Sequence, residues 1–94
     1  MNIDGFIWLE DIIEKLWRKH HVQENEVEQL FHNSPYFRFV ENGHRAGENV
    51  YAALGQTNGG RYLIVFFVHK QNRQALIVSA RNMTDSERGQ YERR

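Results

Sequence analysis

Two segments rich in strand-forming residues, Val50–Gly55 and Arg61–His69, are joined by a short linker that contains Thr57-Asn58-Gly59-Gly60. Asn and Gly tolerate the positive φ angles that tight connections between neighbouring strands require. The two segments are therefore predicted to pair as an antiparallel β-hairpin. Lys70–Arg73 is a polar turn, and Ala75–Ala80 is predicted to return beside Arg61–His69 as the next antiparallel strand.

The residues before this hairpin show helical periodicity. Apolar side chains recur on one helix face between Glu10 and Lys19, and residues 24–31 repeat the i, i+3, i+4 spacing. The two stripes consist of Ile12, Ile13, Leu16 and Trp17 in the first segment and of Val27, Leu30 and Phe31 in the second. Ser34-Pro35 is expected to end the second helix, because proline disfavours helix at the residue before it.

The remaining elements complete an α+β pattern. Tyr36–Val40 is aromatic-rich and is predicted to be a short strand. Thr84 and Glu87 have the spacing of a capping box, which predicts a last helix from Asp85 to the C-terminus. We therefore expect residues 1–94 to form a single α+β domain, with N-terminal helices, an antiparallel β-meander of three to four strands and a C-terminal helix.

The composition argues against several classes of site. The chain has no cysteine, which excludes disulfides and thiolate zinc sites and favours a cytoplasmic location. None of the five histidines lies four residues from another, so neither a metal nor a cofactor is predicted. Gly55–Arg61 lacks the Gly-Lys-Ser/Thr ending of a phosphate-binding loop. The longest apolar segment, Tyr62–Val68, is too short to span a membrane, so no membrane partner is expected.

Charge is divided along the chain although its net value is zero. Residues 1–44 carry four Lys or Arg against eight Asp or Glu, whereas residues 45–94 carry eight against four. A basic half can bind a polyanion and an acidic half can bind a basic protein. The alternative is that folding intermixes the two sets on one surface.

The strand end Ser79-Ala80-Arg81 leads directly into the capped last helix. A strand end of this kind holds a guanidinium rigidly at the edge of a sheet, where it can meet an anion. Upstream, Lys19 offers a second cation, and His20 offers an imidazole that exchanges protons near neutral pH. This combination of residues points to phosphate chemistry.

Four groups of residues together resemble a known family. They are Trp8 and Glu10 with Arg18–Val22, the Glu-rich segment 24–31, the hairpin segments Tyr51–Thr57 and Gly60–Leu63, and Ser79–Arg81 with Met83, Thr84, Glu87, Arg88 and Tyr91. In this order they resemble the BrnT ribonuclease toxins of type II toxin–antitoxin systems, whose fold is similar to the RelE-type toxins. The resemblance covers nearly the whole chain. It implies a RelE-like fold and a metal-independent endoribonuclease that cleaves RNA and arrests growth. It also implies a cognate antitoxin that neutralises the toxin, with DNA bound only through the antitoxin complex.

Each candidate residue has a functional and a structural interpretation. His20 is expected to transfer protons and Lys19 to contact the phosphate; alternatively, His20 caps a helix end and Lys19 is simply solvated. Arg81 is expected to clamp phosphate, or else to form a salt bridge with Glu87 or Glu48. Arg61 either contacts the substrate or solubilises a strand end. Tyr51 and Tyr91 either bind substrate or pack in the core. In the functional interpretation Lys19, His20 and Arg81 face one concave surface.

The chain also departs from the family pattern. His21 stands where the family has glycine, and Val50 stands where many members have arginine before the tyrosine. The second difference removes a cation that could hold phosphate. It therefore keeps open a second function, a catalytically inactive module of the same fold that binds RNA or a protein.

Overall fold

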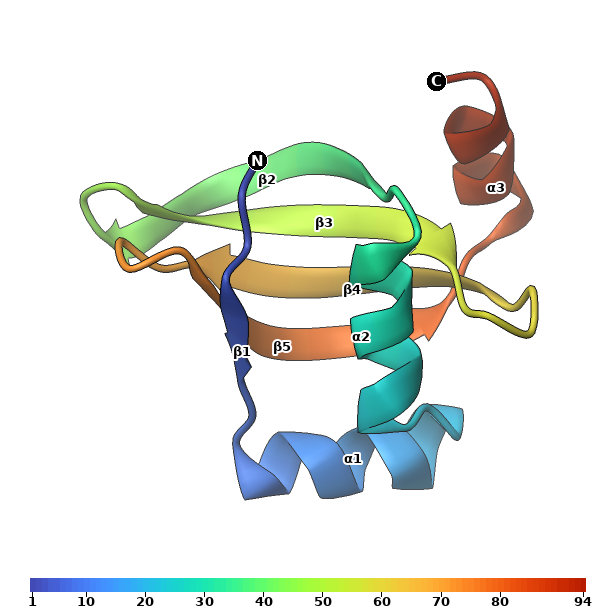
Figure 1. The fold of residues 1–94 in the computed structure, drawn as a ribbon, viewed down its shortest axis with the longest axis horizontal. Coiled ribbons are helices and arrows are strands. Elements are labelled where there is room, and N and C mark those ends of the chain that lie inside the picture. Colours follow the sequence, from blue (N-terminus) through green and yellow to red (C-terminus); the bar gives the residue numbers. More distant parts are fainter.

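The computed structural model describes all residues, 1–94, as three helices and five strands (Figure 1). In chain order these elements are β1 (Gly5–Ile7), α1 (Glu10–His20), α2 (Glu24–His32), β2 (Tyr36–Arg45), β3 (Glu48–Gln56), β4 (Tyr62–His69), β5 (Gln74–Asn82) and α3 (Asp85–Glu92). The α+β class is confirmed, with helices at both ends of the chain.

The predicted hairpin forms where expected. β3 and β4 pair antiparallel: Val50 lies opposite Val68 at one end of the ladder, and Gln56 lies opposite Tyr62 at the other. β4 also pairs antiparallel with β5. Between the first two strands the amide of Thr57 donates to the carbonyl of Arg61 at 3.0 Å, and Gly60 has a φ of 86°. Only glycine adopts that angle without steric cost, so the turn residues determine where the chain reverses.

The predicted count of three to four strands was wrong, because the sheet has five. Its order is β1-β5-β4-β3-β2, and the additional strand β1 pairs parallel with β5 through Phe6 and Ala75. The sheet is therefore mixed rather than wholly antiparallel. β1 has only three residues, and its partner lies about seventy positions away, so the local sequence carries no signal for this pairing.

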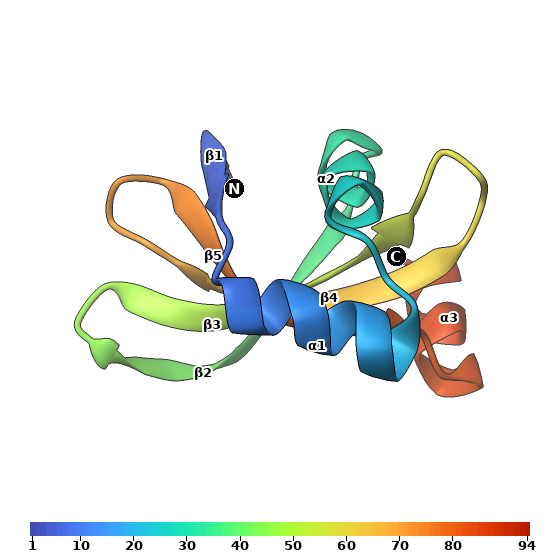
Figure 2. The same ribbon diagram turned by 90° about the horizontal axis from the view of Figure 1, so that it is seen from below.

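The helices cover both faces of the sheet. α1 and α2 bury the larger core, in which Leu16, Leu30 and Phe67 are among the fully buried side chains. α3 lies on the opposite face, where Tyr91 packs with Ile64. Figure 2 shows α2 and α3 on opposite sides of the strands. The predicted capping box is confirmed: the Glu87 amide donates to Thr84 Oγ1, and the Thr84 amide donates to the Glu87 carboxylate.

One residue of the predicted stripe on the first helix does not join the core. Trp17 is 51% exposed, whereas Leu16 is buried against the sheet. Consecutive residues on a helix point about 100° apart, so α1 cannot direct both side chains at the sheet. The prediction that Trp17 packs with the core-facing stripe was therefore wrong, and α1 presents this ring to solvent.

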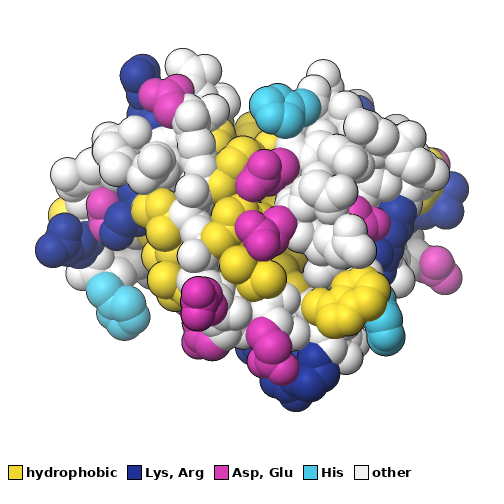
Figure 3. Space-filling view, turned by 60° about the horizontal axis from the view of Figure 1, so that its bottom comes forward, with side chains coloured by type: hydrophobic (Ala, Val, Ile, Leu, Met, Phe, Trp, Pro, Cys, Tyr) yellow, Lys and Arg dark blue, Asp and Glu magenta, His cyan; other side chains and the backbone are white.

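The surface between β1 and α2 is hollowed and carries both apolar and polar residues. Phe6, Phe31 and Phe37 line a pocket there of about 520 Å³, together with residues of the N-terminal segment. On the face drawn in Figure 3, hydrophobic side chains form a continuous band with Asp and Glu side chains among them. Six of the eight acidic side chains in residues 1–44 are exposed in the folded protein. None of the three helices is both long and apolar enough to cross a membrane.

Candidate active site

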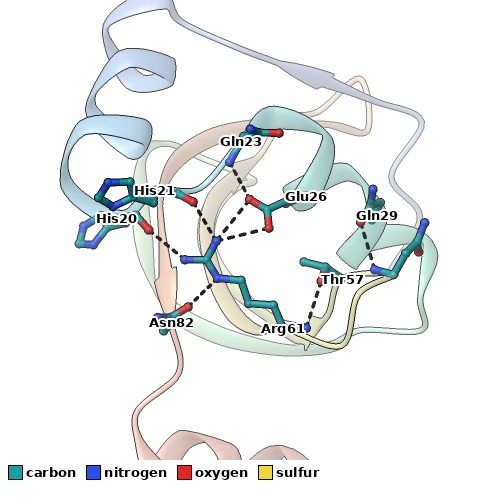
Figure 4. Close-up of polar contacts among 9 residues, drawn as sticks. His20, His21, Gln23, Glu26, Gln29, Thr57, Arg61 and Asn82 are labelled. Atoms are coloured by element: carbon teal, nitrogen blue, oxygen red, sulfur yellow. Dashed lines mark hydrogen bonds and ion pairs between the residues drawn. The ribbon is translucent and has the colours of Figure 1, made fainter.

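The C-terminal end of α1 meets the ends of β4 and β5 through the side chain of Arg61. Its guanidinium donates to the carbonyl oxygens of His20 at 2.9 Å and His21 at 2.8 Å, and to Asn82 Oδ1 at 2.8 Å. The Glu26 carboxylate of α2 lies 3.3 Å from the same group. Figure 4 shows these acceptors surrounding the guanidinium from three sides. Arg61, at the start of β4, therefore links α1, α2 and β5.

This arrangement satisfies a need of α1. The last carbonyl groups of a helix have no partner within the helix and carry the negative end of its dipole. The planar fork of an arginine donates to several such acceptors at once. In place of the predicted substrate contact, the structure directs the guanidinium of Arg61 inward. Arg61 holds the end of the helix that carries Lys19 and His20.

Lys19 and His20 lie in the last turn of α1. Lys19 is exposed and has no salt-bridge partner, and His20 is half-buried. The carbonyl of His20 points to Arg61, while its imidazole ring lies on the other side of the backbone (Figure 4). Lys19 and His20 therefore lie on a stretch of helix end that the hydrogen bonds from Arg61 hold in place.

Arg81 does not join this group, contrary to the expectation of one shared concave surface. It lies opposite Ile64, in the cluster covered by α3, whereas its neighbour Asn82 lies opposite Leu63 of the other core. Residues directly opposite each other on paired strands share a face. The side chain of Arg81 thus points to the α3 face, and that of Asn82 points to the end of α1.

A β-bulge in β5 causes this change of face. Phe66 pairs with Ser79 but Phe67 pairs with Ile77, which leaves Val78 as an extra residue. Strict alternation from the buried Ile77 would place Arg81 on the α1 face. The bulge reverses the alternation after it, and bulges commonly redirect side chains in this way.

On the α3 face Arg81 forms the ion pair that was its alternative interpretation. Its guanidinium binds both oxygens of Glu87, at 2.8 and 2.9 Å. The hydrogen bonds from Arg81 are the main reason that the pKa of the Glu87 carboxyl falls to about 2, and the Thr84 amide lowers it further against the opposing effect of burial. The same pair raises the pKa of Arg81. This contact anchors the first turn of α3 to β5.

The two tyrosines also lie away from the end of α1. Tyr91 is only 6% exposed and packs edge-on against Tyr62, so the prediction that it contacts substrate is not supported by its position. Tyr51 is half-buried and stacks on Phe67. Tyr51 lies five residues along β3 from Gln56, which is paired with Tyr62 next to Arg61. This separation is about 16 Å at the rise of a strand. Both rings make packing contacts with other aromatic side chains.

A family model described as "Ribonuclease toxin, BrnT, of type II toxin-antitoxin system" matches residues 8–87. The chain belongs to the BrnT ribonuclease toxin family. The BrnT match includes Lys19, His20, Arg61 and Arg81 but ends before Tyr91. A search of curated proteins found no match.

The Arg81–Glu87 pair predicts a loss of stability in acid. A carboxyl whose pKa is lower in the folded than in the unfolded state stabilises the fold above its unfolded value. That contribution is complete above about pH 4.5 and is lost as the pH falls toward 2. Glu87→Gln should lower the free energy of unfolding at pH 7 by about 2 kcal/mol, after allowance for solvent screening. The difference in the free energy of unfolding between pH 7 and pH 3 should therefore be smaller in the variant than in the unmodified protein.

Urea unfolding of both proteins at the two pH values measures this effect. Glu48 adds to the acid sensitivity of both, because its pKa is also lowered, chiefly by the hydrogen bond from Lys70. The comparison between variants isolates Glu87 from this background. Glu14→Gln, in the exposed pair with Arg18, is the matched control and should change stability by less than about 0.5 kcal/mol. Equal effects of the two substitutions would contradict the assignment.

Proposed function

We propose that this protein is a cytoplasmic, metal-independent endoribonuclease whose cleavage of RNA arrests growth until a cognate antitoxin neutralises it. Membership of the BrnT family supports a ribonuclease toxin of a type II toxin–antitoxin system. The observation that carries the site assignment is that the exposed Lys19 and the half-buried His20 lie at the end of α1 that Arg61 holds. A RelE-type arrangement of sheet and helices is part of the same proposal.

The reaction follows from these two side chains. The 2′-hydroxyl of RNA attacks the adjacent phosphorus, the bond to the 5′-oxygen breaks, and a cyclic phosphate and a free 5′-hydroxyl result. His20 takes the proton of the attacking hydroxyl, as a general base does, and solvent water gives a proton to the departing 5′-oxygen. The Lys19 ammonium stabilises the extra negative charge that develops on the phosphate oxygens. Only RNA has the attacking hydroxyl, so DNA is not a substrate.

Cleavage assays with the purified chain test the proposal. We expect a labelled single-stranded RNA to be cut in the presence of EDTA, and the same oligonucleotide with 2′-deoxyribose throughout to remain intact. Induction of the chain alone in bacteria should stop growth. Cleavage that requires a divalent metal, or equal cleavage of DNA, would contradict this mechanism.

A second function is favoured by particular contacts. The guanidinium groups of Arg61 and Arg81 are occupied by protein acceptors, and Val50 stands where many family members have arginine. With these two guanidinium groups occupied, the protein would be an inactive module that binds RNA or another protein. Binding of a labelled RNA without any cleavage, and growth unaffected by induction, would favour this function over the first.

We expect the protein to co-purify with the product of a neighbouring short gene. The complex should lose the RNA cleavage of the free chain, because an antitoxin that covers the end of α1 blocks Lys19 and His20. It should also bind its own promoter, whereas the free chain should bind DNA weakly, since its net charge of zero gives little phosphate neutralisation. Gel-shift assays of chain and complex test this. Tight, salt-sensitive DNA binding by the free chain would contradict it.

A further inference from the structure

Trp17 and His21 form an exposed aromatic pair beside the proposed active site. Their ring centroids lie 5.2 Å apart with an interplanar angle of 72°. Trp17 is 51% exposed, and His21 is exposed as well. The ring of His21 lies on the side of the backbone away from Arg61 (Figure 4). We refer to these two side chains as the Trp17–His21 platform.

The backbone of His21 is strained for a residue with a side chain. Its φ of 52° lies in the left-handed region, where its amide donates to the carbonyl of Trp17 at 3.0 Å and ends the helix. Glycine satisfies this conformation at lower cost, because it has no Cβ. The fold alone therefore does not require an imidazole here. The same conformation brings that imidazole against the ring of Trp17.

A neutralised ion pair lies beside the platform. Glu14, about one turn before Trp17 on the same side of α1, pairs with Arg18 at 2.9 Å. Lys15 and Lys19 lie two residues before and after Trp17, and so they lie on the other flank of the helix. The platform itself is next in sequence to His20, the proposed base. An exposed aromatic pair beside that residue fits the flat face of a nucleobase, because unpaired bases stack on aromatic side chains.

We propose that the Trp17–His21 platform binds an unpaired RNA base next to the phosphate that Lys19 and His20 engage. This rests on the proposed ribonuclease function and adds a base-binding subsite to it. Every base has a π-face, so the platform favours unpaired over paired RNA more than it selects one base. It also fixes the register of the strand, and it thereby positions the scissile phosphate at the end of α1.

Binding of a non-cleavable RNA tests the subsite separately from catalysis. The probe is a fluorescein-labelled, single-stranded RNA octamer with 2′-O-methyl groups, titrated with protein while its anisotropy is followed. Trp17→Ala should weaken binding about 5- to 100-fold, as the loss of one stacked base does elsewhere. Phe39→Ala is the matched control, because Phe39 is an equally exposed aromatic residue on β2. It should leave the affinity within about two-fold.

His21→Gly gives a second test with an opposite effect on stability. The substitution removes the imidazole but relieves the left-handed strain, so the melting temperature should stay the same or rise while RNA affinity falls. A fall in both would mean that His21 serves the fold, and this would overturn its place in the subsite. RNA that stacks on Trp17 should quench tryptophan fluorescence, and this quenching should disappear in Trp17→Phe. The other tryptophan, Trp8, is hydrogen-bonded to Glu28 and is not part of the platform.

The remaining outcomes separate this inference from the proposed function. Normal RNA cleavage together with unchanged affinity in Trp17→Ala would overturn the subsite and leave the ribonuclease intact. No binding and no cleavage by the unmodified protein would overturn both. Unchanged RNA affinity with loss of antitoxin binding would identify the platform as a protein contact instead, and would also overturn the inference.

Discussion

Arg61→Ala is expected to destabilise the protein by about 3 kcal/mol. The substitution leaves the carbonyls of His20 and His21 without their donor and the Glu26 carboxylate without its cation. Each lost hydrogen bond of a charged group costs about 1.5–3 kcal/mol, and part of that loss is recovered by water because Arg61 and Glu26 are only partly buried. Chemical denaturation of variant and unmodified protein measures the difference.

Two further variants define the cause of this loss. Arg61→Lys keeps the charge but cannot reach the acceptors as a planar fork, so an intermediate loss is expected. Arg73→Ala is the matched control, because Arg73 forms an exposed pair with Asp4 and should contribute less than about 0.5 kcal/mol. If Arg61→Ala retained full stability and lost only RNA binding, the original prediction of a substrate contact would be right and the structural role wrong.

His20→Ala is expected to reduce RNA cleavage by about 10²- to 10⁴-fold, the usual contribution of a positioned acid–base group. Its effect on stability should be small, because the backbone carbonyl that Arg61 binds remains in place. The rate of cleavage of a labelled RNA under single-turnover conditions provides the measurement. Added imidazole should restore part of the activity if the side chain transfers a proton rather than only shaping the site.

His32→Ala provides the comparison for this experiment. His32 is an exposed histidine in the last turn of α2, and so it matches His20 in type and in position on a helix. Its replacement should leave cleavage unchanged. Equal losses in both variants would point to a general effect on folding, and unchanged cleavage in His20→Ala would remove His20 from the mechanism.

The sequence alone determined those features that depend on neighbouring residues. The turn residues Thr57–Gly60 place the hairpin, and Thr84 and Glu87 start the last helix, because each signal acts within a few positions. The order of motifs from Trp8 to Glu87 was also sufficient to indicate the BrnT family. Lys19 and His20 lie in the last turn of α1, where the sequence predicts that the helix ends.

The tertiary structure decided which side chains can act together. The bulge at Val78 turns Arg81 to the α3 face, and no local pattern reveals one inserted residue within an apolar strand. Arg61 finds its acceptors twenty to forty positions away, so its role as a helix cap depends on how three elements pack. Trp17 is exposed because α1 lies on the sheet through Leu16. Local periodicity fixes the elements, whereas register and packing fix the direction of each functional side chain.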